Sequence, residues 1–196
     1  MDVPSPGDLS GQRERILSAA LRLMSEHGVH AMSMRRLAEE CGLNVATIYH
    51  YFPSKAGLLT QVIEQRSYER RLLAEVPSVD HGGDRRARLT QMLCWIWEQM
   101  NDQTDMWRLL LGESLRGDGE AIAKAAALSA TFEDSLVRWL TELVPDLDID
   151  PVTAARVLRG SVYGFFVEVL PLDAEDRLEI LRARAVDVSA AMVAGC

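Results

Sequence analysis

The spacing of apolar residues constrains the fold most, because it repeats every three to four positions along nearly the whole chain. Ile16, Ala20 and Met24 in the first such segment fall on one face of a helix. No segment alternates apolar and polar residues as a half-buried strand does, and the Asp118-Gly119 pair lies between two helical segments rather than in a hairpin. The sequence therefore predicts an all-α protein of about nine helices.

Capping and helix-breaking residues predict where these helices begin and end. Ser10 or Gly11, Ser33 and Asn44 are suited to the N-terminal ends of the first three, and Gly28 and Gly42 to the C-terminal ends of the first two. Pro77 and two glycines mark the stretch 76–83 as the clearest loop. The expected helices cover about residues 10–27, 33–41, 45–52, 54–75, 84–101, 104–115, 118–144, 150–170 and 173–193.

Composition places the chain among ordinary globular proteins, with 196 residues, 48% of them hydrophobic and 26% charged. No uncharged apolar stretch reaches the roughly 18 residues that a membrane-spanning helix needs, and residues 1–12 do not resemble a secretory signal. Three cysteines, at positions 41, 94 and 196, are too few and too scattered for a disulfide framework or a zinc site. We therefore expect a reduced, cytoplasmic protein without a membrane partner.

Charge is distributed unevenly and suggests two modules with different partners. Residues 1–55 hold six Lys and Arg against six Asp and Glu, so the whole net charge of −8 falls on residues 56–196. The neutral front end predicts modest non-specific affinity for nucleic acid, because counterion release depends on local Lys and Arg.

The front module fits the plan of a helix-turn-helix, at about residues 33–52. Ile48 and Phe52 of the third helix point inward in a three-helix core, which six apolar positions can close: Ile16, Ala20, Met24, Leu37, Ile48 and Phe52. Lys55 falls in the first turn of the next helix, where the helix dipole and the ammonium group both favour a phosphate. The third helix is left with residues on its other faces that suit phosphates and base edges: Val45, Ala46, Thr47, Tyr49, His50 and Tyr51.

These residues carry a resemblance to a known family. The segments 15–20 and 34–55, and above all the Thr-Ile-Tyr-His-Tyr-Phe-Pro-Ser-Lys stretch at 47–55, resemble the tetracycline-repressor (TetR) family of bacterial regulators. The resemblance covers about residues 10–70, which we expect to form the DNA-binding domain after a flexible tail, residues 1–9. It implies phosphate-holding roles for Thr47, Tyr49, Tyr51 and Lys55, sequence-reading roles for Arg35, Val45, Ala46 and His50, and a DNA-binding role for Ser33. Each of these side chains taken alone is as well explained by packing or solvation.

The resemblance further implies that residues 71–196 form a helical domain that binds a small molecule and dimerises through its last two helices. The stretch 157–172 is apolar nearly all round, which gives partial independent support, since such a helix must be covered on every side. Gly160 and Gly164 lie one turn apart and would let the backbone of a second subunit come close. The alternative is that this helix is simply central in a monomer.

Large, adaptable side chains gather in the two helices expected at 84–101 and 104–115. Such residues could line a pocket for a small, largely apolar ligand, although ordinary core packing is at least as good an explanation for any single one. The candidate ligand-binding residues are Met92, Trp95, Met100, Met106 and Trp107.

Motifs for enzyme activity are missing from the sequence, which has no Gly-x-Ser-x-Gly, phosphate loop or dinucleotide fingerprint. His27 and His30 lack a third ligand for a metal, so we expect no catalytic residue, metal or cofactor. The expected function is a homodimeric repressor that binds a near-palindromic operator and is released by a small ligand. The alternatives are an activator, a regulator without a ligand, or a small-molecule-binding protein that no longer binds DNA.

Overall fold

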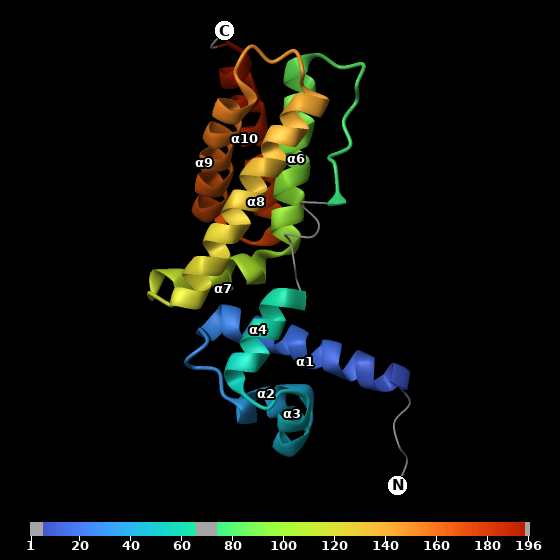
Figure 1. The fold of residues 1–196 in the computed structure, drawn as a ribbon, viewed down its shortest axis with the longest axis vertical. Helices are drawn as coiled ribbons and strands as arrows, with labels where there is room; N and C mark the ends of the chain where they lie inside the picture. Colours follow the sequence, from blue (N-terminus) through green and yellow to red (C-terminus); the bar gives the residue numbers. More distant parts are fainter. Residues whose placement is uncertain (1–5, 66–73, 195–196) are drawn as a thin grey trace. The chain divides into compact units, whose positions relative to one another are not determined.

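The computed structural model describes residues 6–65 and 74–194, and in these two stretches the chain is helical and has no strand (Figure 1). This confirms the predicted all-α fold. The helices are α1 (Pro6–His27), α2 (Met34–Cys41), α3 (Val45–Tyr51), α4 (Lys55–Gln65), α6 (Arg85–Asp102), α7 (Thr104–Leu115), α8 (Gly119–Leu143), α9 (Pro151–Val169) and α10 (Ala174–Ala194).

Two helix ends differ from the sequence-based expectation. α1 begins at Pro6, so the predicted flexible tail of residues 1–9 is too long: residues 6–9 are helical, and residues 1–5 lie outside the described part. Proline suits the first position of a helix because its fixed φ is helical and its missing N–H would have no partner there. The helix expected over 54–75 is described to Gln65, and residues 66–73 lie outside the described part.

Local capping explains why the short helices of the front module form. The Ser33 hydroxyl accepts a hydrogen bond from the Arg36 N–H at 3.1 Å, and Asn44 Oδ1 accepts one from the Ala46 N–H at 2.8 Å. Gly42 ends α2 with a φ of +65°, a left-handed conformation that glycine adopts without steric cost. The predicted caps of both helices are confirmed.

The chain folds into two compact units. Unit 1 comprises the described residues of Met1–Ser67 and Asp105–Ala125, and unit 2 those of Tyr68–Thr104 and Ala126–Cys196. Most of α7 and the first turns of α8 therefore belong to unit 1, together with the front module. The boundary predicted from the sequence, at residue 70, assigns them to the second domain. α8 contributes residues to both units.

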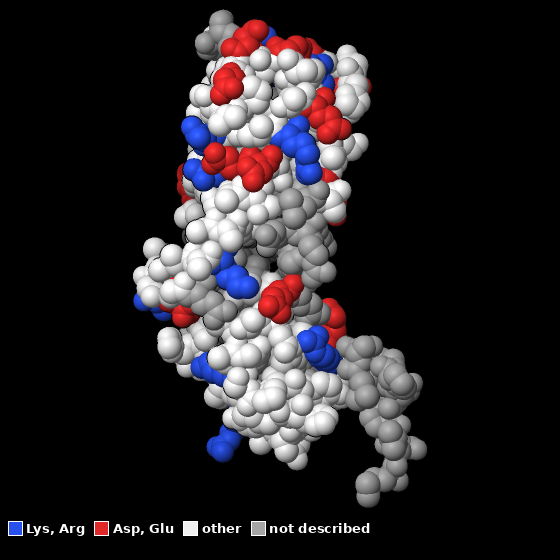
Figure 2. All heavy atoms as spheres, viewed as in Figure 1, with Lys and Arg blue, Asp and Glu red and all other residues white. Residues whose placement is uncertain are grey.

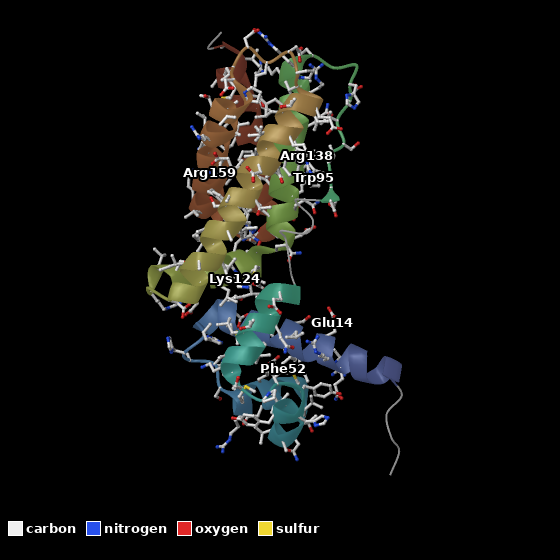
Figure 3. The ribbon with its side chains drawn as sticks, viewed as in Figure 1. Glu14, Phe52, Trp95, Lys124, Arg138 and Arg159 are labelled. Carbon is white, nitrogen blue, oxygen red and sulfur yellow. The ribbon has the colours of Figure 1, made fainter. Side chains whose placement is uncertain are left out.

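The core of unit 1 is built on α1, which packs against α2 and α4, while α2 packs against α3. The six apolar residues predicted to close this core are all at most 1% exposed: Ile16, Ala20, Met24, Leu37, Ile48 and Phe52. Phe52 lies among the helices of this unit in Figure 3. Their burial determines which face of α3 points outward.

The core of unit 2 is built on α6, which packs against α10 and α9. The indole N–H of Trp97, in α6, donates a hydrogen bond of 3.2 Å to the Val162 carbonyl oxygen in α9, which ties these helices together in the buried interior. None of the described helices is both long enough and apolar enough to cross a membrane.

Candidate nucleic-acid interface

Helix α3 presents a small, mixed apolar and polar face to solvent. Ile48 is fully buried, whereas Val45 is 38% exposed, Tyr49 is 49% exposed, and Ala46 and His50 are also exposed. This combination of small side chains, a phenol and an imidazole matches what a base edge or a phosphate can contact in a major groove. The four exposed residues therefore share one face of α3, and their contact with DNA stays a prediction.

Tyr51 and Thr47, which also belong to the predicted DNA-binding set, are less exposed to solvent than these four residues. Both are half-buried, and the Tyr51 hydroxyl donates a hydrogen bond of 3.0 Å to Gln12 Oε1 in α1. The Arg13 guanidinium lies over the neighbouring Phe52 ring, 5.6 Å from its centroid. Tyr51 and Phe52 thus anchor α3 on α1, and a phosphate contact from the Tyr51 hydroxyl, which stays a prediction, requires release of the Gln12 bond.

Helix α2 contributes Ser33, at its N-terminal cap, and the exposed side chain of Arg35. The next residue, Arg36, is held by α1, because its guanidinium donates a hydrogen bond of 2.7 Å to the ring Nε2 of His27. Arg35 is therefore the better placed of the two arginines to reach a duplex.

Lys55 begins α4 and is half-buried. Its ammonium group donates a hydrogen bond of 3.2 Å to the carbonyl oxygen of His30, in the loop between α1 and α2. Two N–H donors of the ammonium stay available for an anion, since Lys carries three. The Lys55 side chain thus spans from the start of α4 to this loop.

The charge on α2 and α3 is balanced, because α2 carries two arginines against two glutamates and α3 carries no Lys, Arg, Asp or Glu. On the face seen in Figure 2, uncharged side chains cover most of the region of α2 and α3, with isolated Lys and Arg between them. This agrees with the balanced charge of residues 1–55. A DNA contact made by these helices would therefore rely on shape and on a few directed contacts more than on a broad basic surface.

The five candidate ligand-binding residues are divided between the units. Met92, Trp95 and Met100 lie on α6 in unit 2, where the two methionines are buried and Trp95 is half-buried. Met106 and Trp107 lie on α7 in unit 1 and are buried. A ligand pocket shared by all five stays a prediction.

Trp95 begins a row of aromatic contacts that leads through unit 2. Its ring lies edge-on to that of Trp139 at a centroid distance of 5.6 Å, and Phe132 links Trp139 to Tyr163 at 6.5 and 5.5 Å. Burial raises the pKa of Tyr163 to about 12. Sequence reasoning missed Phe132, Trp139 and Tyr163, because they are spread over α8 and α9 and each fits a helical core pattern.

Comparison with known proteins now identifies the front module. The family model described as bacterial regulatory proteins of the tetR family matches residues 16–62. This span contains α2, α3 and Lys55, and therefore includes the exposed residues of the candidate interface.

Relatives extend the likeness beyond this module. The chain is 29% identical over 147 residues to the transcriptional repressor KstR of Rhodococcus jostii, covering 75% of this chain and 67% of that protein. Salmonella enterica GusR has the same fold, with a TM-score of 0.67 at 21% identity over 99% of both chains. A transcriptional regulator of Saccharomonospora viridis, solved in complex with choline, gives a TM-score of 0.69 at 23% identity over 91% of this chain and 95% of its own.

The motif, the family model and the similarity to KstR agree with one another, and the likeness to the solved structures supports the fold. The chain belongs to the TetR family of bacterial regulatory proteins and is a DNA-binding transcriptional regulator, not an enzyme.

Proposed function

We propose that this protein is a repressor that binds a near-palindromic operator as a homodimer and is released from it by a small ligand. The exposed face of α3 carries the DNA-binding part of the proposal, because the buried Ile48 and Phe52 leave Val45, Tyr49 and His50 outward at once. That relatives such as KstR are named repressors supports the direction of regulation.

A dimer would explain how so small a face achieves operator affinity. Two copies of α3 in successive major grooves, about 34–36 Å apart, would double the contacts on a site with two-fold symmetry. A ligand that binds better to a state with another spacing would then shift the population off the DNA by its differential affinity. α9 supports the dimer, because the positions of Gly160 and Gly164 are exposed and open in the single subunit.

Selection of DNA by the protein itself tests the operator proposal. The purified protein is incubated with a randomised 30-base-pair library, and the bound duplexes are enriched and sequenced. We expect one motif with two inverted half-sites about one helical turn apart. Enrichment of a single half-site, or no enrichment at all, would contradict the proposal, and the second result would favour a small-molecule-binding protein without DNA affinity.

Unit 2 supports the ligand part of the proposal through its aromatic cluster, Trp95, Phe132, Trp139 and Tyr163. Aromatic rings can hold an apolar group or, by their faces, a cation. The solved relative from Saccharomonospora viridis binds choline, so choline is the first probe. We expect it to change tryptophan fluorescence and to weaken binding to the selected duplex. If it does neither, choline is not the ligand, and a panel of largely apolar compounds becomes the next test.

A further inference from the structure

Glu113, near the end of α7, is a charged side chain placed where charge is costly. It is only 3% exposed, whereas most Asp and Glu of a folded chain lie in water. A buried carboxylate is tolerated when it is paired and hydrogen-bonded. Glu113 has two such partners in unit 1, the backbone N–H of Val29 and the guanidinium of Arg116.

Both partners lie at the loop between α1 and α2. One carboxylate oxygen of Glu113 accepts a hydrogen bond of 3.1 Å from the backbone N–H of Val29. The same oxygen accepts one of 2.7 Å from the Arg116 guanidinium, which also lies against Gly28. A Cβ at Gly28, where φ is +82°, would come within 3.3 Å of that guanidinium. Helix α7 therefore holds residues 28 and 29 from one side.

Lys55, on the predicted DNA-binding surface, contacts the same loop at the next residue. The carbonyl oxygen of His30, one residue after Val29, accepts the hydrogen bond from the Lys55 ammonium group at 3.2 Å. Two consecutive residues of one loop thus contact a buried carboxylate of α7 and the lysine expected to hold a phosphate. Only the backbone dihedrals of Val29 and His30 separate the two contacts, so a displacement of one has a short path to the other.

We propose that Glu113 is a positioning residue for DNA binding, which acts through Val29 and His30 on the Lys55 ammonium group. Glu113 touches no DNA in this proposal. It fixes the loop, and the loop directs Lys55 toward the phosphate. The inference rests on the proposed operator binding and adds to it the route by which α7 controls that binding.

A double-mutant cycle tests this route on the full-length protein, with the selected duplex as the probe. Glu113→Ala should weaken binding by about three- to tenfold in the wild-type background, but by less than about twofold in the Lys55→Ala background, because residues in one network are not additive. It should also lower the dependence of log K on log salt toward that of Lys55→Ala, by up to about 1. Loss of fold alone would weaken both backgrounds equally.

Two further variants separate the Val29 contact from simple charge. Glu113→Gln keeps an oxygen that can accept the Val29 N–H, so affinity and salt dependence should stay within about twofold of the wild type. Glu113→Asp keeps the charge but shortens the reach, so it should behave as Glu113→Ala does, and it replaces that variant if alanine prevents folding. Glu98→Ala is the control, because Glu98 pairs with Arg182 in unit 2 and touches no part of the loop.

Equal losses in both Lys55 backgrounds, or a Glu113→Gln variant as weak as Glu113→Ala, would overturn the proposal. A wild-type protein that selects no duplex would instead show that the proposed operator binding is wrong. The two failures are therefore distinguishable.

Discussion

Lys55 uses one of its three N–H donors on the carbonyl oxygen of His30, so the ammonium group is oriented and still able to bind a phosphate. We predict that Lys55→Ala weakens binding almost uniformly across operator variants and reduces the salt dependence of binding by about 1. Lys124→Ala is a matched control, since it removes the only other lysine of the chain, which lies in α8. A changed base preference with an unchanged salt dependence would contradict the role of Lys55.

The exposed residues of α3 should act on particular base pairs instead. We predict that substitutions of Val45, Ala46 or His50 alter preference at one or two positions of the selected motif, where a wrong base pair costs about 1–3 kcal/mol. Tyr49→Phe should weaken all sites alike, because a phenol bound to a phosphate carries no base information. Repeated selection with each variant measures this. If all three variants select the same motif as the wild type, these residues do not read the bases, and Arg35 or the shape of the DNA must determine the preference.

Tyr163 provides a pH-dependent prediction. Burial raises its pKa from 10.0 to about 12, so folding favours the neutral phenol. The neutral Tyr163 phenol stabilises the folded state by about 2–3 kcal/mol below pH 10. This stabilisation is lost between pH 10 and 12, because the tyrosine of the unfolded chain ionises at a lower pH than that of the folded chain. The free energy of unfolding in urea should therefore fall more steeply from pH 10 to 11 in the wild type than in Tyr163→Phe. Equal slopes would mean that the phenol ionises freely in the folded state.

At the scale of the helices, Arg177 joins three elements of unit 2. It is 5% exposed, and its guanidinium donates to Asn101 at the end of α6, at 2.8 Å, and to the carbonyl oxygens of Leu170 and Leu172 after α9. We predict that Arg177→Met lowers the free energy of unfolding by about 2–4 kcal/mol, because these part-buried acceptors lose a buried, charged donor.

Urea denaturation measures the loss, and Arg182→Met is the control. Arg182 pairs with Glu98 at the surface, where solvent screens an ion pair and such pairs add little to stability. A loss of stability in Arg177→Met no larger than that in the control would contradict this prediction. It would mean that water replaces the guanidinium as the donor to the three acceptors.

Local chemistry explains how much of this structure the sequence could predict. The Ser33 and Asn44 caps and the buried positions Ile48 and Phe52 follow from rules that act within four residues, and all are confirmed. The bond between Tyr51 and Gln12 spans 39 positions, and that between Val29 and Glu113 spans 84. Periodicity cannot indicate such partners, because it reports which face is buried and not which polar groups meet there.

At the scale of the whole molecule, α9 carries an exposed stripe that a single subunit leaves uncovered. Val157 is 51% exposed and Val167 is 47% exposed, and Gly160 and Gly164 lie between them on the same face at helical spacing. A Cβ at either glycine would meet nothing within 4 Å. The glycines are therefore not required for packing inside the subunit, although each costs a helix about 1 kcal/mol relative to Ala.

We predict that this stripe is the dimer contact and that Gly160→Leu with Gly164→Leu yields a folded monomer. The open space at both positions means that the subunit itself should accept the two side chains, so helix content and thermal stability of the monomer should survive. A closely packed partner helix would not accept them, since overpacking costs about 1–3 kcal/mol at each site. Sedimentation measures the subunit state, and binding to the selected duplex should fall steeply because one half-site holds too few contacts. The matched control is alanine at both positions, which adds one carbon each and favours the helix. A leucine variant that sediments as a dimer and binds the duplex as the wild type does would place the subunit contact on another surface.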